Sequence, residues 1–533
     1  MTTCGEFLVK QLEAWGVETV FGIPGVHTVE LYRGLPGSRI RHVTPRHEQG
    51  AGFMADGYAR VTGKPGVCFI ITGPGMTNIL TAMAQAYADS IPMLVISSVN
   101  ERARLAHGNG YLHELPNQRN LVGNVCAFSH TLMSAEELPA VLARAFAVFD
   151  SERPRPVHIE LPLDVITAPA EHLALRPRTV TSRPAPALAP LREAAARLRN
   201  AKKPLLLLGG GCVEAAAEAR ALAAALDAPT ALTINAKGLL PADHPLLLGS
   251  NQSCVPVREL ATEADVVLAI GTELGETDYD VVFDGGFALD GELIRIDIDP
   301  QQLMRNYTPS LAIHSDARLA MRVLLAELPG GEASPDSPGA RRAAAVRQRL
   351  AEDFAGWSHY RQLFAAILAE WPDARFVGDS TQTVYSGNHL VDLDEPRRWF
   401  NASTGYGTLG YGLPAAIGAK LGEPGRPVVS LMGDGGLQFT LPELASAVEA
   451  KVGIVVLLWN NHGYGEIKRY MERREITPLG VDIYTPDFLA IARGFGCAAE
   501  RARDLEHLRE LLRGAPADRP LIVEVLQAAP FHP

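Results

Sequence analysis

An aspartate between glycines and a pair of asparagines follow two neighbouring apolar segments near the end of the chain. Asp434, in Gly-Asp-Gly, comes directly after "RPVVSLM", and Asn460 and Asn461 come directly after "GIVVLLW". Both segments have the composition of buried strands, and we expect a helix between them that begins at Thr440 with Glu443 as its capping box. A right-handed crossover places the carboxyl ends of both strands at one edge of a parallel sheet. Asp434 and Asn461 should therefore converge, although 27 positions separate them.

The converging groups are hard oxygen donors. The Asp434 carboxylate, the Asn461 amide oxygen and the nearby backbone carbonyl of Gly463 would form half of a magnesium shell. Magnesium bound in this way completes its shell with phosphates, and the glycines beside Asp434 let backbone N–H groups approach a diphosphate. For Gly-Asp-Gly alone, a tight turn without a ligand is the alternative. The asparagine pair after the next strand favours a metal and diphosphate site.

Length and composition exclude several classes of protein. The 533 residues are too many for one core, and 47% hydrophobic against 20% charged residues indicate several folded domains. A net charge of −11 and a pI near 5.8 offer no basic stripe for nucleic acid or a membrane surface. No apolar run approaches the roughly 18 residues of a membrane span, and no signal peptide is recognised. Six scattered cysteines, without a C-x-x-C pair, suit a reducing compartment, so we expect a soluble cytoplasmic protein.

Two segments rich in proline and alanine divide the chain into three blocks of similar size. Residues 167–190 and 329–340 lack strand or helix periodicity and are predicted to be linkers. Within each block, short apolar runs alternate with helical patterns, which predicts parallel sheets covered on both faces. We therefore expect an α/β fold with three doubly wound parallel-sheet domains, over residues 1–168, 186–330 and 345–533.

The first and last blocks also resemble each other. "GKPGVCFIITGPG" in the first block parallels "GEPGRPVVSLMGDG" in the last. The spacing from Gly75 to Asn100 and from Gly435 to Asn460 is 25 positions in both. Any two β–α–β units share features of this kind, but the equal spacing favours a duplicated domain.

Gly-Asp-Gly, 24 further residues and then Asn-Asn is similar to the signature of thiamine diphosphate (ThDP) enzymes, in the branch of acetolactate synthases and 2-oxoacid decarboxylases. The resemblance covers the whole chain. It implies that the first domain binds the pyrimidine of the cofactor and that the third binds its diphosphate with Mg²⁺. The central domain would be structural or bind an extra nucleotide. The active site would lie between two subunits, in a homodimer or, commonly, a homotetramer.

Glu48, in "PRHEQGAGFMADGYAR", matches the glutamate of this family that hydrogen-bonds a pyrimidine ring nitrogen. A carboxyl group there promotes the imino tautomer of the cofactor's amine, which removes the thiazolium proton to form the ylid. Taken alone, Glu48 would be a charge on a helix dipole; in register with the signature, we expect it to be catalytic. Leu409 matches the bulky residue that holds the cofactor bent, and a core position is its alternative. Including these, the resemblance implies cofactor contacts from Pro24, Glu48, Gly73, Asn78, Thr381, Gln382, Thr383, Gly407, Leu409, Gly433, Asp434, Gly435, Gly436, Asn461, Gly463 and Tyr464.

Histidines and carboxylates are the candidates for contact with a substrate. His113 stands where acetolactate synthase-like members commonly have glutamine; it could shuttle the proton that quenches a carbanion, or be a surface-loop histidine. His27 follows "FGIPGV", where relatives place residues that touch substrate. Glu466 lies one residue short of the position of a catalytic pocket glutamate in decarboxylases, and Glu30 and Glu114 are further acidic candidates. Several carboxylates would suit a cationic substrate.

The glycine run in the central block resembles a dinucleotide loop only in part. Gly209 and Gly211, in "LLLLGGGC", are followed by Glu214 where a third glycine would complete G-x-G-x-x-G. A bound flavin or nicotinamide is therefore not supported. FAD is left open, because the FAD contacts of the family do not form a compact motif.

Three functions remain. "FGIPGVHTVELYRGLPG" and "RHEQGAGFMADGYAR" look closest to 2-ketoarginine (5-guanidino-2-oxopentanoate) decarboxylases, carbon–carbon lyases of arginine catabolism. This resemblance implies non-oxidative conversion of that 2-oxo acid to 4-guanidinobutanal and carbon dioxide. An acetolactate synthase-like carboligase, which condenses two 2-oxo acids, is the second possibility. The third is a catalytically inactive cofactor-binding subunit; the presence of Glu48 and of both halves of the metal site counts against it.

Overall fold

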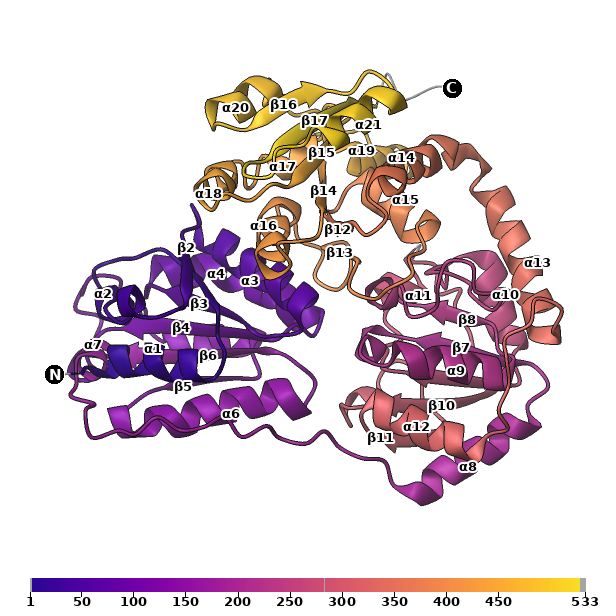
Figure 1. Cartoon of the computed structure of the whole chain (residues 1–533), viewed down its shortest axis with the longest axis horizontal. Coiled ribbons are helices and arrows are strands. Elements are labelled where there is room, and N and C mark those ends of the chain that lie inside the picture. The colour runs from indigo at the N-terminus through magenta and orange to yellow at the C-terminus, as the bar shows by residue number, and fades with distance from the viewer. Residues whose placement is uncertain (1, 282, 528–533) are drawn as a thin grey trace. The chain divides into compact units, whose positions relative to one another are not determined.

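The computed structural model describes residues 2–281 and 283–527, and it contains three parallel β-sheets in successive parts of the chain (Figure 1). The chain forms two compact units. The first comprises the residues up to 182, residues 377–381 and the residues from 401 onward; the second comprises residues 183–376 and 382–400. The predicted α/β class with three parallel-sheet domains is confirmed.

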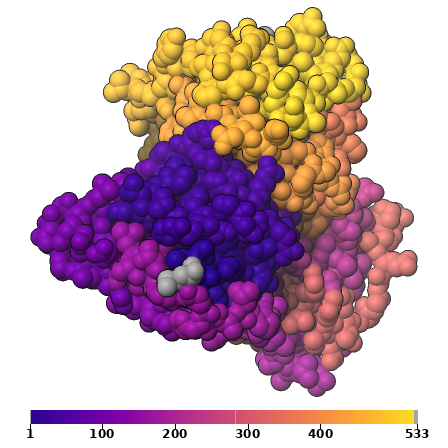
Figure 2. Space-filling model, turned by 60° about the vertical axis from the view of Figure 1, so that its left-hand side comes forward, coloured from indigo at the N-terminus to yellow at the C-terminus, as the bar shows by residue number. Residues whose placement is uncertain are grey.

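The N-terminal sheet has six strands in the order β2-β1-β3-β4-β6-β5. Helices α1 and α6 pack on one face through alternate strand residues such as Val67 and Phe69, and α3 and α4 lie on the other. Figure 2 shows part of the outer surface of this domain in indigo and purple. Its strands are β1 (Thr19–Gly22), β2 (Arg41–Val43), β3 (Gly66–Ile70), β4 (Met93–Val99), β5 (Phe128–Thr131) and β6 (Pro156–Pro162). Its helices are α1 (Cys4–Ala14), α2 (Val29–Tyr32), α3 (Glu48–Thr62), α4 (Pro74–Ala88), α5 (Gln118–Val122), α6 (Leu138–Ser151) and α7 (Leu163–Ile166).

The C-terminal sheet repeats this connectivity in the order β13-β12-β14-β15-β17-β16. Each strand has a counterpart at the same place in the N-terminal sheet, so the strand order agrees with the predicted duplication. The strands are β12 (Arg375–Gly378), β13 (Trp399–Asn401), β14 (Val428–Gly433), β15 (Val455–Asn460), β16 (Ala498–Arg501) and β17 (Leu521–Leu526). The helices from residue 338 onward are α13 (Pro338–Asp353), α14 (Ser358–Glu370), α15 (Gln382–Leu390), α16 (Gly412–Gly422), α17 (Asp434–Leu437), α18 (Glu443–Glu449), α19 (Gly465–Arg473), α20 (Phe488–Gly494) and α21 (Leu505–Arg513).

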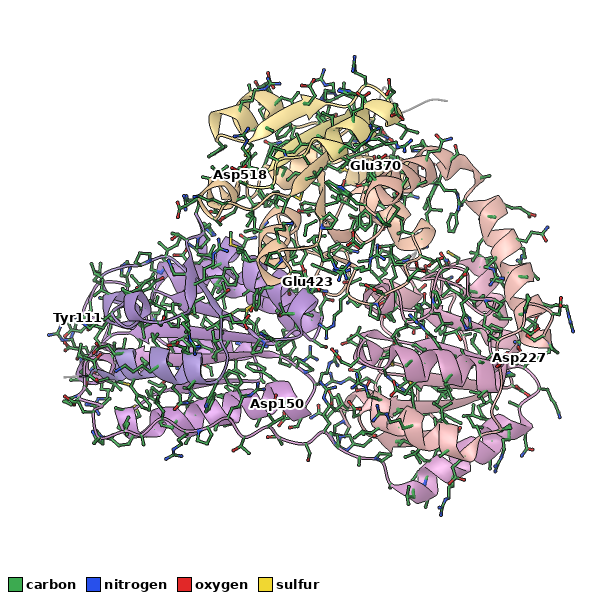
Figure 3. The ribbon with its side chains drawn as sticks, viewed as in Figure 1. Tyr111, Asp150, Asp227, Glu370, Glu423 and Asp518 are labelled. Atoms are coloured by element: carbon green, nitrogen blue, oxygen red, sulfur yellow. The ribbon has the colours of Figure 1, made fainter. Side chains whose placement is uncertain are left out.

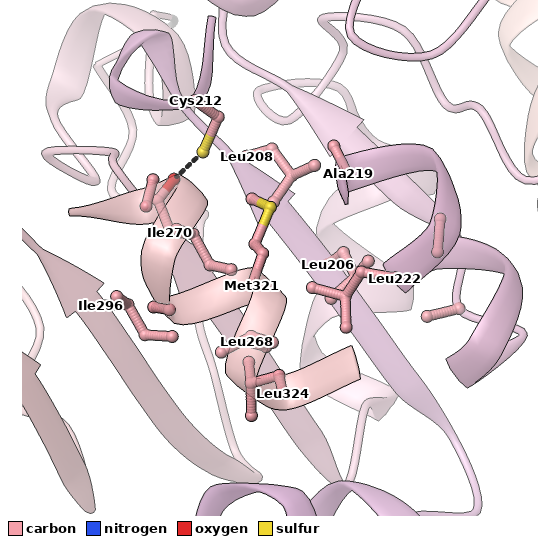
Figure 4. Close-up of a cluster of buried hydrophobic side chains, with 14 of the residues drawn as sticks. Leu206, Leu208, Cys212, Ala219, Leu222, Leu268, Ile270, Ile296, Met321 and Leu324 are labelled. Carbon is pink, nitrogen blue, oxygen red and sulfur yellow. Dashed lines mark hydrogen bonds between the residues drawn. The ribbon is translucent and has the colours of Figure 1, made fainter. Parts of the chain in front are cut away.

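The central sheet has five strands in the order β11-β10-β9-β7-β8, around a core of buried leucine, isoleucine and methionine side chains (Figure 4). The Cys212 thiol donates a hydrogen bond to the Ile270 carbonyl at 3.3 Å. A Cβ atom on Gly209 would lie 2.1 Å from the Gly271 oxygen, so the glycine run allows two strand-end turns to pack together. The strands are β7 (Pro204–Leu208), β8 (Thr230–Leu232), β9 (Val266–Ile270), β10 (Glu292–Asp297) and β11 (Leu311–His314). The helices are α8 (Leu188–Asn200), α9 (Ala216–Leu226), α10 (Val255–Glu263), α11 (Glu276–Tyr279) and α12 (Ala317–Glu327).

Several local expectations can be compared with this fold. Of the predicted linkers 167–190 and 329–340, residues 167–187 and 329–337 form neither helix nor sheet strand, whereas residues 188–190 begin α8 and residues 338–340 begin α13. All six cysteines are free thiols. None of the helices in the described part of the chain combines the length and hydropathy needed to cross a membrane.

The predicted capping box at Thr440 and Glu443 is wrong. Helix α18 begins at Glu443 itself, and its N-cap residue, Pro442, makes no side-chain cap. The Thr440 hydroxyl donates to the Gly410 carbonyl, and the Glu443 carboxylate accepts from backbone N–H groups near residue 46. The local pattern was right for a cap, but both side chains have partners far away in sequence.

Helices α3 and α16, both in the first compact unit, approach so closely that their backbones touch. A Cβ atom on Gly57 would lie 2.0 Å from the Ala415 oxygen, and one on Gly418 would lie 1.8 Å from the Met54 oxygen. Only glycine permits this approach, because any side chain would overlap the facing carbonyl. The contact fixes α3, which begins at Glu48, against the C-terminal domain.

Gly57→Ala is expected to destabilise the protein by about 1–3 kcal/mol, because the added methyl group overpacks a contact between two backbones. Denaturant unfolding would measure the loss. Gly494→Ala, where no atom lies within 4 Å of the added Cβ, is the control and should unfold at the wild-type midpoint or slightly later. An unchanged midpoint for Gly57→Ala would contradict this account of the helix pair.

A buried polar network crosses the middle of the N-terminal sheet. His158, on β6, is fully buried, with Nε2 2.8 Å from the Ser97 hydroxyl and Nδ1 2.7 Å from the Ser129 hydroxyl. Gln118 continues the network, since its amide donates to Ser97 and accepts from the Gly73 N–H at 3.2 Å. Burial lowers the pKa of His158 from 6.5 to about 3, because the imidazolium form would be charged inside the sheet.

His158 is therefore expected to make stability fall in acid. Between pH 6.5 and about 3 the unfolded chain binds a proton that the folded protein does not, so stability is lost as the pH falls through this window. The contribution is about 1.4 kcal/mol per pH unit. Unfolding curves across this range should show a steeper loss for the wild type than for His158→Gln. Equal slopes for the two proteins would contradict the prediction.

Candidate active site

The N-terminal half of the site lies at the carboxyl ends of β1, β2 and β3. Glu48 is the first residue of α3 and is 9% exposed. Asn78, on α4, donates a hydrogen bond to Glu48 Oε2 at 2.9 Å. A Cβ atom on Gly75 would lie 3.3 Å from Glu48 Oε1, so the carboxylate sits over the first turn of α4, whose dipole favours a negative charge. Two of the residues predicted from the sequence are thus in direct contact.

Two histidines meet beside the turn that starts α4. Gly73 has φ +70°, and a Cβ atom there would lie 2.8 Å from the Cβ of His113, so the loop of His113 packs directly on this turn. The rings of His27 and His113 stand edge to face, with centroids 5.3 Å apart. Burial, and secondarily His113, lower the pKa of His27, and within the described residues its Nδ1 has no hydrogen-bond partner. The pair could accept or deliver a proton.

The acidic substrate candidates are engaged within their own segments. Glu114 accepts backbone N–H groups of Gly108, Gly110 and Tyr111 at 2.7–3.1 Å, in the loop that Tyr111 marks in Figure 3. These bonds lower the pKa of Glu114. Glu30 forms a two-point ion pair with Arg33, and Glu466 pairs with Arg469. The structure therefore gathers the histidine candidates but not these three carboxylates.

The C-terminal half is built on the ends of β12, β14 and β15. Gly433 lies opposite Trp459 in the β14–β15 register, so Asp434 and Asn460 leave the sheet side by side. The glycines let neighbouring loops close in. A Cβ atom would lie 2.8 Å from the Thr381 hydroxyl at Gly433, and 2.6 Å from the Tyr464 ring at Gly435. The first two residues of α15, Gln382 and Thr383, follow Thr381 along the chain.

Three oxygens of this half face one another. The Asn461 amide points its oxygen at the Asp434 carboxylate and the Gly463 carbonyl; turned over, its nitrogen would donate to Asp434 Oδ1 at 3.1 Å and to Gly463 O at 2.8 Å. Neighbouring oxygens of an octahedral Mg²⁺ shell, with bonds of about 2.1 Å, lie about 3 Å apart. Asp434 is 1% exposed, its Oδ2 has no partner among the described residues, and burial raises its pKa. A divalent cation would satisfy all of these atoms with the amide as placed.

The donor set is incomplete for a metal on its own. Within the residues that the structure describes, no group of three histidine, cysteine or acidic side chains could hold an ion. One carboxylate, one amide and one carbonyl leave half of an octahedral shell for other oxygens, such as phosphates. The arrangement therefore suits a cation that binds together with a phosphorylated molecule.

Asp379 is a site residue that sequence reasoning missed. It is fully buried and accepts from the N–H groups of Ser380 at 2.7 Å and Gly410 at 2.8 Å. Its carboxyl group also lies 3.2 Å from where a Cβ on Gly436 would stand. Burial raises the pKa of Asp379 to about 6. Asp379 thus contacts three segments: the Thr381 loop, the Gly-Asp-Gly turn and the loop of Gly407 and Leu409. The feature of the sequence that could have identified it is its position directly after strand β12.

Three family models of thiamine pyrophosphate enzymes match the chain. The N-terminal TPP binding domain matches residues 2–121, the central domain 191–324 and the C-terminal TPP binding domain 379–525. These matches contain both halves of the site described above, with Glu48 in the first and Asp434 in the last.

Curated relatives extend the similarity over nearly the full length. The chain is 51% identical to a probable 2-ketoarginine decarboxylase, AruI, of Pseudomonas aeruginosa, over 96% of this chain and 91% of that protein. It is 34% identical to the large subunit of acetolactate synthase isozyme 1 of Escherichia coli, over 93% of this chain and 88% of the relative. It is 31% identical to a probable acetolactate synthase large subunit of Methanocaldococcus jannaschii, over 99% and 93%. From its three matched domains and these relatives, the chain belongs to the thiamine pyrophosphate enzyme family.

Proposed function

We propose that the chain is a ThDP- and Mg²⁺-dependent decarboxylase that converts 5-guanidino-2-oxopentanoate to 4-guanidinobutanal and carbon dioxide. The choice of this substrate is supported by the 51% identity, over 96% of the chain, to a probable 2-ketoarginine decarboxylase. The geometry supports the chemistry, because a buried carboxylate, a histidine pair and a three-oxygen cluster lie at the strand ends.

In this proposal Asp434, Asn461 and the Gly463 carbonyl would hold Mg²⁺ through three oxygens and leave its other positions for phosphate oxygens. When bound, ThDP would supply a nucleophilic carbon and an electron sink for the decarboxylation of a 2-oxo acid. Glu48, oriented by Asn78, hydrogen-bonds the pyrimidine and holds the proton that shifts its tautomer. Leu409 supports the bent cofactor.

The histidine pair supplies the proton that ends the reaction. A decarboxylase must protonate the product carbon before a second 2-oxo acid attacks it, and His113, whose ring packs against the half-buried ring of His27, is the proposed proton donor. Glu30, Glu114 and Glu466 are proposed to contact the guanidinium group. Glu30 and Glu466 each pair with an arginine that a substrate guanidinium could replace charge for charge, whereas Glu114 would have to give up backbone N–H groups, and the structure does not bring these three carboxylates together.

The proposed oligomeric state is the one that the family resemblance implies, and the proposed cellular compartment is inferred from the cysteines. We propose a homotetramer built from dimers, in which the two halves of each active site come from different subunits of a dimer. Leu479 and Tyr484, each 85% exposed, are large apolar side chains of the kind that an interface would cover. Six free thiols favour the cytoplasm.

An acetolactate synthase-like carboligase is the second candidate, favoured by the 34% identity to the Escherichia coli enzyme subunit. It differs from the first in product rather than in cofactor site. A product assay therefore separates the two.

The purified protein, supplied with ThDP and Mg²⁺, should release 4-guanidinobutanal and carbon dioxide from 5-guanidino-2-oxopentanoate faster than from pyruvate, benzoylformate or a branched-chain 2-oxo acid. Glu48→Gln should reduce the rate about 10²–10⁴-fold, because the tautomer shift loses its carboxyl group. Glu18→Gln, at a carboxylate paired with Lys64 on the surface, is the control and should be fully active. Acetolactate from pyruvate without guanidino turnover would reject the decarboxylase and favour the carboligase.

A further inference from the structure

Glu443, at the start of α18, reaches from the C-terminal domain to the segment that leads into α3. Its Oε1 accepts the backbone N–H of Arg46 at 3.0 Å and that of His47 at 3.1 Å. The Ser446 hydroxyl donates to its Oε2 at 2.6 Å. Glu443 is 1% exposed, so these bonds are shielded from water. Both residues that it binds immediately precede Glu48.

The surroundings leave this carboxylate one position. A Cβ atom on Gly50 would lie 2.2 Å from Glu443 Oε1, so glycine at this position of α3 leaves room for the carboxylate. The Arg46 side chain pairs with Glu449 on the same helix, and Arg41 donates to the Ala450 carbonyl at 2.6 Å. Helix α18 therefore contacts the segment before α3 at several points. Of these contacts, the one made by Glu443 is buried and binds the main chain of that segment.

The entry to α3 sets the direction of the Glu48 side chain. His47 is the N-cap of α3; its Nδ1 accepts the Gln49 N–H at 3.1 Å and its carbonyl accepts the Ala51 N–H at 3.1 Å, so the peptides on both sides of Glu48 are fixed. A shift of the chain at residues 46–47 would turn the first residue of the helix and break its contact with Asn78. Reacting groups that move by about 1 Å can lose about 100-fold in rate.

The segment that carries Glu443 also touches the Leu409 loop. The Thr440 hydroxyl donates to the Gly410 carbonyl at 3.0 Å, directly after Leu409. Within one compact unit, residues 440–446 thus contact both the loop predicted to bend the cofactor and the start of the helix with the predicted catalytic carboxylate.

We propose that Glu443 is a positioning residue that fixes Glu48 for its work on the cofactor, through the backbone of residues 46 and 47. This inference rests on the role of Glu48 proposed above. Glu443 contacts neither substrate nor cofactor in this account; it links the C-terminal domain to the geometry of the proton-transfer group.

Glu443→Gln tests the proposal, because it keeps the size of the side chain but removes its negative charge and one of the two oxygens that accept the Arg46 N–H and the Ser446 hydroxyl. Two measurements are needed. Amide hydrogen exchange of residues 44–52, followed by mass spectrometry without cofactor, reports whether the entry to α3 has loosened. The rate at which the C2 proton of bound ThDP exchanges for deuterium, followed by NMR, reports how well Glu48 promotes removal of that proton.

We expect faster amide exchange at residues 44–52 and C2 exchange slowed about 10- to 100-fold, with the KM for ThDP nearly unchanged. Glu449→Gln is the matched control on the same helix, because it removes only the partner of the Arg46 side chain, and both readouts should stay at wild-type values. Should Glu443→Gln fail to fold, Ser446→Ala removes one donor to the same carboxylate and is expected to shift both readouts in the same direction by less.

Wild-type C2 exchange in folded Glu443→Gln, or a loss of thermal stability with no change in C2 exchange, would overturn the proposal and leave Glu443 a purely structural residue. The proposed function fails in a different way. If the wild-type protein itself does not accelerate C2 exchange over free ThDP, then Glu48 lacks the proposed role. In that case Glu443 has no catalytic group to position.

Discussion

The contact between α3 and α16 is the constraint on which the rest of the first unit depends. Gly57 and Gly418 allow each helix to touch the backbone of the other, and no other residue type fits either position. A buried ion network lies at the same contact, with Arg60 paired to Asp56 and Asp89. Because α3 begins at Glu48 and α16 follows the Leu409 loop, the helix pair fixes the N-terminal and C-terminal half-sites of one chain against each other, and in the proposed dimer the partner subunit completes each of them.

The parts that sequence could predict are those set by strand connectivity. Parallel strands bring their carboxyl ends to one edge, so Asp434, Asn461 and Gly463 were expected together, and in the structure the Asn461 side-chain amide lies within hydrogen-bonding distance of the Asp434 carboxylate and the Gly463 carbonyl. The contact of Glu48 with Asn78 follows in the same way from the ends of β2 and β3.

The parts that sequence missed depend on partners far along the chain. Glu443 matched a local capping pattern, yet its carboxylate binds residues about 400 positions earlier, which no local pattern encodes. Asp379 has no motif of its own and is recognised only when three loops meet around it. Glu30 and Glu114 were chosen for their charge, and charge alone does not say whether an arginine or a backbone turn already occupies a carboxylate.

Two glycine-rich turns illustrate why a motif needs its surroundings. Both follow a buried strand of a parallel sheet. In the C-terminal domain the missing side chains make room for Thr381 and Tyr464 around Asp434, one oxygen of which has no hydrogen-bond partner among the described residues. In the central domain, the space at Gly209 is filled by the carbonyl of Gly271, another turn of the protein itself. The first turn therefore leaves an acidic side chain as a candidate ligand, whereas the space at the second is occupied by the protein itself.

The most direct test of the account is the dependence of ThDP binding on a divalent cation at Asp434. Calorimetric titration of the wild-type protein with ThDP should show tight binding with Mg²⁺ and little binding with a chelator present. In Asp434→Asn, which keeps the shape but removes the negative charge from the three-oxygen cluster, Mg²⁺ should no longer restore tight binding. Equally tight binding by the wild type with and without the metal, or by the variant with it, would contradict the assignment of this cluster as the anchor of the cofactor.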